Sequence, residues 1–145
     1  MKLRDVLDLI PEIKEFMTPE EMDESTFALA KKYPDLVRVD QVGESTQHYP
    51  IYRLRIGSGH KKALIFGCPH PNEPIGAMMI EHLSRILCEQ EELLKELDTT
   101  FHFIKCVDPD GLHLNEGWLK GPFSYENYAS HFYRPASLKQ VEWTF

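Results

Sequence analysis

The stretch Phe66-Gly67-Cys68-Pro69-His70-Pro71-Asn72-Glu73-Pro74-Ile75-Gly76-Ala77 carries the chain from a predicted strand into a predicted helix. The strand is the run Ala63-Leu64-Ile65-Phe66. A short continuous apolar run of this kind is typical of a strand that is covered on both faces, in the middle of an α/β sheet. Three prolines, Pro69, Pro71 and Pro74, stiffen the connection, and Pro74 suits the first turn of a helix. Ligands usually bind at the carboxyl ends of central strands, so we expect this loop to face a cleft.

The same loop holds two side chains that bind metal ions well, His70 and Glu73. Imidazole and carboxylate are both good zinc ligands, and a rigid turn that carries the two reduces the entropy lost when an ion binds. An H-x-x-E pair is a weak pattern on its own, because a glutamate in this position also caps a helix and a histidine also fills a turn. The pair is a candidate half of a metal site, and its meaning depends on the rest of the chain.

Downstream of this loop the pattern predicts a helix, a strand and then an irregular segment. Apolar residues recur on one helical face from Pro74 to about Leu94, and residues 101–107 form another apolar strand pattern. Strand, helix and strand in this order imply a right-handed parallel crossover if both strands lie in one sheet. The aromatic segment from Trp118 to Tyr133 has no clear period, which is typical of a long functional loop.

Upstream of the loop the sequence predicts two helices and a hairpin. Residues 3–16 have helical apolar spacing that Pro11 interrupts. Thr18, Pro19 and Glu21 form a capping-box pattern, which predicts a helix that begins there and ends at about Tyr33. Residues 37–39 and 51–56 then read as two strands joined by a polar turn.

Length and composition indicate one α/β domain, residues 1–145, with three layers: a mixed, mostly parallel sheet flanked by helices. The excess of 23 acidic over 16 basic residues gives a formal net charge of −7, which argues against nucleic acid as a partner. No apolar run approaches the roughly 20 residues that cross a bilayer, and the start does not read as a signal peptide, so we expect no membrane partner and a cytoplasmic location. The three cysteines, Cys68, Cys88 and Cys106, are expected to be buried thiols.

Three short motifs resemble one enzyme family when they are taken in order along residues 62–134. Residues 67–77 are similar to the metal-binding turn of the zinc metallocarboxypeptidases, in which H-x-x-E follows a strand and precedes a helix. Residues 107–111, Val-Asp-Pro-Asp-Gly, resemble the N-P-D-G turn of that family, with Asp108 in place of the usual Asn. Phe132-Tyr133-Arg134 stands where the family carries an arginine that polarises the scissile carbonyl. The chain therefore looks like the N-terminal portion of a carboxypeptidase A-like, bacterial-type member.

The resemblance implies zinc as the cofactor and a peptide or small amide as the substrate. His70 and Glu73 would be zinc ligands, and Arg134 would stabilise the oxyanion. The family's third ligand, a histidine on a later strand, its glutamate base and its Asn-Arg pair for the substrate carboxylate have no counterpart here. The remaining histidines offer no substitute, because they fall in a predicted helix, at the start of a strand or in predicted loops: His82, His102, His48, His60, His113 and His131.

The resemblance also implies that this chain encodes about half of an eight-stranded mixed sheet. Half a sheet exposes an apolar face and an unpaired edge, so we expect weak or no activity alone and either homo-oligomers or pairing with a missing C-terminal portion. Two rival interpretations stay open. One is a zinc deacylase of the aspartoacylase and succinylglutamate desuccinylase type, which shares the H-x-x-E turn, although the aromatic segment favours peptides. The other is a non-catalytic binding module on the same fold.

Overall fold

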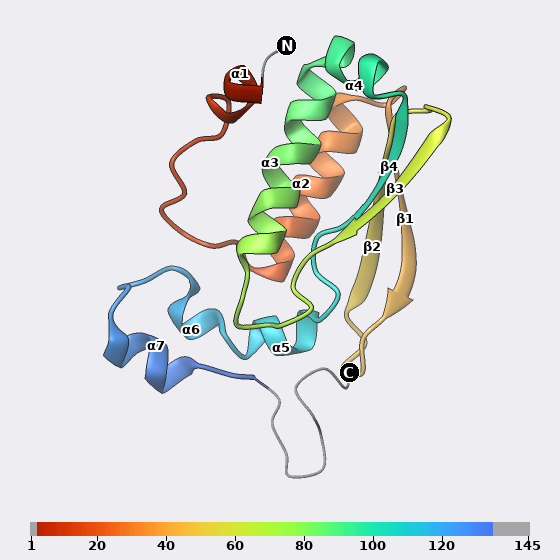
Figure 1. Ribbon diagram of the computed structural model, residues 1–145. Coiled ribbons are helices and arrows are strands. Elements are labelled where there is room, and N and C mark those ends of the chain that lie inside the picture. The colour runs from red at the N-terminus through yellow and green to blue at the C-terminus, as the bar shows by residue number, and fades with distance from the viewer. Residues whose placement is uncertain (1–2, 135–145) are drawn as a thin grey trace.

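The structure is a computed structural model that describes residues 3–134 of the 145. Its helices and strands follow one another along the chain as Figure 1 shows, from red at the N-terminus to blue. In order they are α1 (Leu3–Leu7), α2 (Pro19–Lys32), β1 (Val37–Glu44), β2 (Pro50–Ile56), β3 (Lys61–Phe66), α3 (Ile75–Glu89), α4 (Glu91–Leu97), β4 (Thr99–Ile104), α5 (Pro109–His113), α6 (Glu116–Leu119) and α7 (Tyr125–His131). The predicted α/β class is confirmed.

The four strands form one mixed sheet in the order β1-β2-β4-β3. β1 and β2 are the predicted hairpin and pair antiparallel, and β2 pairs antiparallel with β4. β3 and β4 pair parallel, with Ala63 opposite Phe101 and Phe66 opposite Ile104, so the predicted parallel crossover through α3 is confirmed. In the described part of the chain, antiparallel pairings therefore outnumber the parallel one.

One face of the sheet is covered by α2, α3 and α4, which lie together on the same side of it (Figure 1). The core between them consists of side chains from both layers: Val37, Leu54, Ile56, Phe103, Ile80, Leu87, Cys88 and Leu94. These residues are almost fully removed from water, and apolar burial of this kind is the main term that stabilises a small domain. The sheet and the helical layer thus form a rigid base for the loops that leave the ends of β3 and β4.

The other face of β3 is open, which corrects the prediction for this strand. Leu64 is 63% exposed and Phe66 is 52% exposed, and β3 lies at the edge of the described sheet instead of its middle. An apolar run indicates that a strand is meant to be covered, but it does not say whether the covering elements belong to the same stretch of chain. Within residues 3–134, helices α2, α3 and α4 cover one face of the sheet, and the expected helical layer on the other face of β3 is absent.

The helix predicted from the capping box is confirmed, and the helix predicted after Pro74 is present but interrupted. The predictions for the N-terminal segment and for the aromatic segment are wrong. Helix α2 has the complete Thr18–Glu21 capping box and ends at Tyr33 as predicted. The predicted helix after Pro74 is interrupted at Gln90, where the backbone leaves the helical region and α4 begins. The N-terminal helix is wrong beyond Leu7, because Pro11 and the residues around it form no helix. The aromatic segment is also not irregular, since it contains α6 and α7.

A second, smaller core lies under the loops at the carboxyl ends of the parallel strands. It joins α2, the start of α3 and the α5–α6 segment through Met22, Cys68, Ala77, Leu112, Trp118 and Leu119.

The three cysteines are free, as predicted, and burial raises the pKa of the Cys88 thiol to about 12. No helix among the described residues is long and apolar enough to cross a membrane. The cytoplasmic location stays a prediction.

Candidate active site

The loop that holds the two candidate ligands begins where β3 ends against β4 and α3. Gly67 donates its N–H to the Ile104 carbonyl at 2.9 Å and accepts from the Val107 N–H at 3.1 Å, so the parallel pairing continues past the strand. A Cβ at Gly67 would lie 2.5 Å from the Lys105 carbonyl oxygen and 2.8 Å from the Ala77 nitrogen. Only glycine fits here, because two backbone segments approach this atom closely. The loop therefore starts at a fixed point on the sheet.

His70 and Glu73 are held by a tight turn at the tip of this loop. The Glu73 N–H donates to the His70 carbonyl at 3.0 Å, and Pro74 then caps α3. Pro71 between them is buried, whereas the Glu73 side chain is about half exposed. The turn keeps the two candidate ligands on one short, stiff segment, as the sequence predicted.

The Asp108-Pro109-Asp110-Gly111 turn packs directly on the loop that holds His70 and Glu73. The Asp108 carboxylate caps α5 by accepting the Gly111 N–H at 2.9 Å, which agrees with the structural role expected for it. A Cβ at Gly111 would lie 2.7 Å from the Pro71 ring, so glycine allows the two turns to touch. Asp110 reaches the β1–β2 connection, where its carboxylate accepts from the Ser45 hydroxyl at 2.5 Å and the Gln47 N–H at 3.1 Å.

Arg134 reaches the same place although it is 61 positions after Glu73. Its Nη1 lies 3.1 Å from the Glu73 Oε1, and its side chain is only 20% exposed. The segment that carries Arg134 is fixed by Asn115, which is fully buried. The Asn115 Nδ2 donates to the Tyr133 carbonyl at 2.9 Å and its Oδ1 accepts the Tyr133 N–H at 3.1 Å. Asn115 thus holds the backbone of the residue next to Arg134 on both sides.

These loops surround a cleft of about 770 Å³ on the open side of the sheet. His70, Asp108 and Arg134 all line it, so the three motifs that the sequence singled out meet at one site. Other walls come from the β1–β2 connection and the ends of β3 and β4, namely Glu44, Ser45, Thr46, Gln47, Ile51, Phe66 and Ile104. Of the aromatic segment, Tyr133 lines the cleft, whereas Trp118 is 7% exposed and belongs to the second core. Trp118 therefore does not contact a ligand in this cleft.

His70 lines this cleft, whereas Glu73 does not line it and lies at its edge through its ion pair with Arg134. The donor atoms of the two residues suit a zinc ion. His70 supplies an imidazole and Glu73 a carboxylate, and a carboxylate bonded to Arg134 through one oxygen keeps a second oxygen for coordination. Among residues 3–134, no third histidine, cysteine or carboxylate joins the pair in a cluster of metal ligands. The half-site is compatible with zinc and incomplete within the described residues.

Behind the cleft, a buried lysine ties the second core to the two long helices. Lys105 forms an ion pair with Glu81 at 2.6 Å and donates to the Met22 carbonyl at 3.2 Å. Burial lowers the pKa of Lys105, and the nearby Glu81 opposes that shift. Burial also raises the pKa of Asp23 on α2 to about 6, with a further contribution from Glu20. These charges lie between the helical layer and the end of β4.

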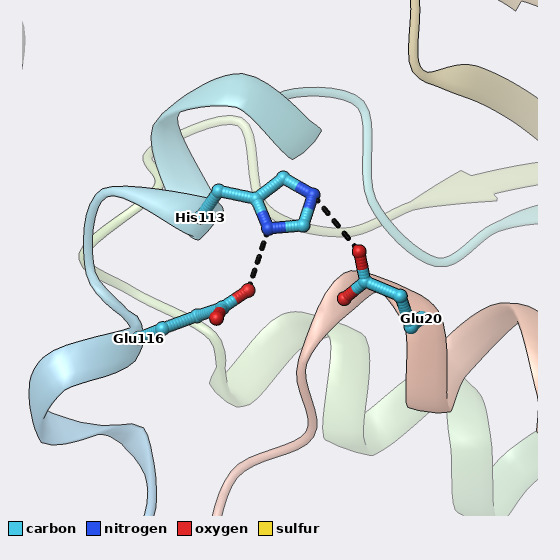
Figure 2. Close-up of side chains that lie close together, drawn as sticks. All are labelled: Glu20, His113 and Glu116. Atoms are coloured by element: carbon cyan, nitrogen blue, oxygen red, sulfur yellow. Dashed lines mark hydrogen bonds and ion pairs between the residues drawn. The ribbon is translucent and has the colours of Figure 1, made fainter.

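A second cluster of potential metal ligands was missed by the sequence analysis, which placed His113 in a loop without a role. Figure 2 shows the His113 ring between the carboxylates of Glu20 and Glu116. The Glu116 Oε1 lies 2.6 Å from Nδ1 and the Glu20 Oε1 3.3 Å from Nε2. The available signal was the repetition of one pattern, because His113-Leu114-Asn115-Glu116 has the same H-x-N-E spacing as residues 70–73.

The model of the zinc carboxypeptidase family matches residues 22–130, which is most of the chain. The chain belongs to the zinc carboxypeptidase family. This match confirms the resemblance that the three short motifs indicated, and it includes both the H-x-x-E turn and the D-P-D-G turn. No curated protein sequence matches the chain significantly.

Solved structures of carboxypeptidases have the same fold as this member of the family. Bovine thrombin-activatable fibrinolysis inhibitor, solved in complex with tick carboxypeptidase inhibitor, is 21% identical with a TM-score of 0.66 over 74% of this chain. Carboxypeptidase A from Helicoverpa armigera is 20% identical with a TM-score of 0.61 over 79%. A metallo-carboxypeptidase from Burkholderia cenocepacia is 23% identical with a TM-score of 0.59 over 66%. The matched region covers 36%, 33% and 28% of those chains, so this chain spans about a third of their length.

Proposed function

We propose that this chain carries the first half of the active site of a zinc-dependent carboxypeptidase that hydrolyses a C-terminal peptide or amide bond. The observation that carries the proposal is the 3.1 Å contact between Arg134 and Glu73, together with the position of Arg134 and His70 on the wall of one cleft. Family membership supports the same reaction, since the H-x-x-E turn occupies the same place at the end of a strand. His70 and Glu73 are the proposed zinc ligands and Arg134 is the proposed catalytic arginine.

The residues of this chain have separate parts in such a reaction. When bound at such a site, a zinc ion activates a water molecule and polarises the scissile carbonyl. The Arg134 guanidinium, fixed through Asn115 and Tyr133, places positive charge where the tetrahedral intermediate accumulates negative charge. Its ion pair with Glu73 neutralises one carboxylate oxygen and holds the guanidinium at the cleft in the absence of substrate.

The proposed substrates are peptides or small amides. The cleft of about 770 Å³ is large enough for an amino acid residue and part of a peptide. Its walls combine apolar side chains, such as Phe66 and Ile104, with the imidazole of His70 and the guanidinium of Arg134. An apolar wall with a few placed charges is typical of a site that binds an organic ligand and orients it.

We further propose that the chain alone is a poor catalyst. Catalytic zinc normally has three protein ligands and one open position, and His70 and Glu73 gain no third ligand among the described residues. The remaining ligand and the general base would come from sequence outside residues 3–134. The exposed Leu64 and Phe66 on the edge strand β3 support pairing with such a portion, or with a second copy of the chain.

Zinc binding and hydrolysis test the proposal in two steps. In a Glu20→Gln background, which removes one carboxylate of the separate Glu20–His113 cluster, equilibrium dialysis should show that His70→Ala and Glu73→Gln each weaken zinc binding at least tenfold. His60→Ala, at an exposed histidine outside the cleft, should leave it unchanged. Release of C-terminal amino acids from short peptides should be weak in this chain and should appear, sensitive to chelators, when a complementary C-terminal portion of a family member is supplied. Robust hydrolysis by the 145 residues alone would contradict the need for a further ligand.

A non-catalytic binding module is the second candidate, and the incomplete ligand set favours it. Such a module would bind peptides in the cleft without turnover under any of these conditions. Peptide binding that survives Glu73→Gln and the removal of zinc would support the module. The deacylase interpretation predicts hydrolysis of small N-acyl amino acids in preference to peptides, so the same assay separates it.

A further inference from the structure

The His113 imidazole is held between two carboxylates that come from different helices. Glu20 lies in the first turn of α2, His113 ends α5 and Glu116 begins α6, as Figure 2 shows. Ligand atoms of the three residues all lie within 4.8 Å of one another. The His113 side chain is mostly buried, and the Tyr49 ring packs against it with centroids 4.2 Å apart. The imidazole is therefore fixed in position and not a solvated surface group.

The two ring nitrogens of His113 have different surroundings. Nδ1 is bonded to the Glu116 Oε1 at 2.6 Å. Nε2 is buried and makes no hydrogen bond in the described structure, and the Glu20 Oε1 lies 3.3 Å from it. A carboxylate that accepts from one ring nitrogen while the other faces a second ligand is the arrangement that orients metal-binding histidines. A separation near 3.3 Å also matches two neighbouring ligands of a tetrahedral ion with bonds of about 2.1 Å.

The space next to Nε2 can hold further ligands. His113 and Glu20 both line a cavity of about 40 Å³ between α2, α5 and the sheet, which has room for water. The Asp23 carboxylate lines the same cavity and adds negative charge. Lys105 is the lysine on its wall, and its ammonium is already paired with Glu81 at 2.6 Å. The cavity thus combines an imidazole with excess negative charge, which favours a divalent cation of the zinc type over magnesium.

We propose that His113 and Glu20 bind a second zinc-type cation in this cavity, with Glu116 orienting the imidazole through Nδ1. The ion joins α2 to the α5–α6 segment at a site separate from His70 and Glu73. Asn115 lies between His113 and Glu116 and holds Tyr133 next to Arg134. Binding at this second site therefore stabilises the wall of the cleft that carries the proposed catalytic arginine.

Zinc titration of the 145-residue chain tests this site without interference from the first one. The starting protein carries His70→Ala and Glu73→Gln, so the result does not depend on the proposed function. Equilibrium dialysis with zinc chloride should find about one bound ion per chain, and zinc should raise the melting temperature. Magnesium chloride at the same concentration should do neither.

Three further substitutions in that background identify the ligands. Glu20→Gln and His113→Asn should each weaken zinc binding at least tenfold, and Glu116→Gln should weaken it less, because its carboxylate acts through the ring. His60→Ala is the matched control, since His60 pairs with a carboxylate, Asp98, at 3.0 Å and with no second carboxylate among residues 3–134. Glu20 is exposed enough that Glu20→Gln should keep the fold even if His113→Asn does not. No zinc binding in the background protein, or binding that Glu20→Gln leaves unchanged, would overturn the proposal.

Discussion

The two H-x-N-E segments of this chain have the same spacing and different surroundings. In residues 70–73 the Asn72 Nδ2 makes a long hydrogen bond of 3.4 Å to the Tyr128 hydroxyl, and Glu73 pairs with Arg134. In residues 113–116 the asparagine is fully buried, and the glutamate bonds to the histidine of its own segment. The first segment lies in a proline-rich loop at the large cleft, and the second joins two short helices against α2.

The difference shows that spacing in the sequence determines which side chains lie close together, whereas tertiary packing determines their exposure and their bonding partners. The loop at residues 70–73 leaves Glu73 half exposed beside a cationic residue from far along the chain. At residues 113–116 the same letters provide a buried amide that ties down Tyr133 and an imidazole held by two carboxylates. The first arrangement is half exposed to solvent, and the second fixes, through Tyr133, the segment that carries Arg134.

Among substitutions in the two segments, the largest effect is expected at Asn115, and it is a loss of stability. Its amide also donates to the Gly111 carbonyl and accepts from the Trp118 indole, both at 2.9 Å. Asn115→Leu leaves these buried partners unsatisfied and should lower the free energy of unfolding by about 3 kcal/mol or more. Asn72→Leu, the matched change in the other segment, should cost less than about 1 kcal/mol. Urea denaturation measures both, and equal losses would show that the two asparagines are equally important to the fold.

Arg134 comes next, because it joins the first segment to the proposed chemistry. In an active form of the enzyme that contains this segment, Arg134→Ala should lower kcat by about a hundredfold or more, since it removes the positive charge proposed to stabilise the oxyanion. Zinc content should stay nearly unchanged, because the arginine neutralises Glu73 but is not a ligand. Arg55→Ala, an exposed arginine on β2, is the control. Unchanged turnover would remove Arg134 from the mechanism.

A smaller effect is expected where the first segment touches the D-P-D-G turn. In Gly111→Ala the new Cβ would lie 2.7 Å from Pro71 and 2.5 Å from the Asp108 carboxylate, so one turn must move. We expect a loss of about 2 kcal/mol in the free energy of unfolding and weaker zinc binding at His70. Gly43→Ala meets only the Ile51 side chain at 3.8 Å and should change either quantity little. Equal effects at the two glycines would show that the turns are not packed as described.

The smallest effect concerns pH and Asp23, beside the second segment. Its pKa is raised by burial and by Glu20 from 3.8 to about 6, so the folded chain holds a proton that the unfolded chain has lost. Stability from this group is present below about pH 4 and falls as the pH rises through 6. With chelator present, Asp23→Asn should therefore raise the free energy of unfolding by roughly 1 kcal/mol at pH 7.5, after allowance for solvent screening, and change it little at pH 4. An equal gain at both values would assign the effect to something other than ionisation.

Local chemistry in the sequence was enough to predict several elements of the fold. The Thr18–Glu21 capping box placed α2, and the apolar pattern around a polar turn placed the β1–β2 hairpin. Apolar spacing predicted a longer N-terminal helix than α1, because the length of such a short helix depends on packing that the pattern does not show. The aromatic segment was misread for the same reason, since α6 and α7 are short and are stabilised by contacts such as Trp118 with Tyr128.

By itself, the sequence determined the site motifs and their family, because residue types at fixed short spacings specify a turn that holds His70 near Glu73 and a cap made by Asp108. The family resemblance assigned Arg134 to the same site, but only the tertiary structure shows its contact with Glu73 across 61 positions, which depends on a buried amide, Asn115, whose partners are distant in sequence. The tertiary structure also placed Glu20 beside His113, and it left β3 at an edge. Contacts of this kind arise from how layers and helices pack, and no local pattern contains that information.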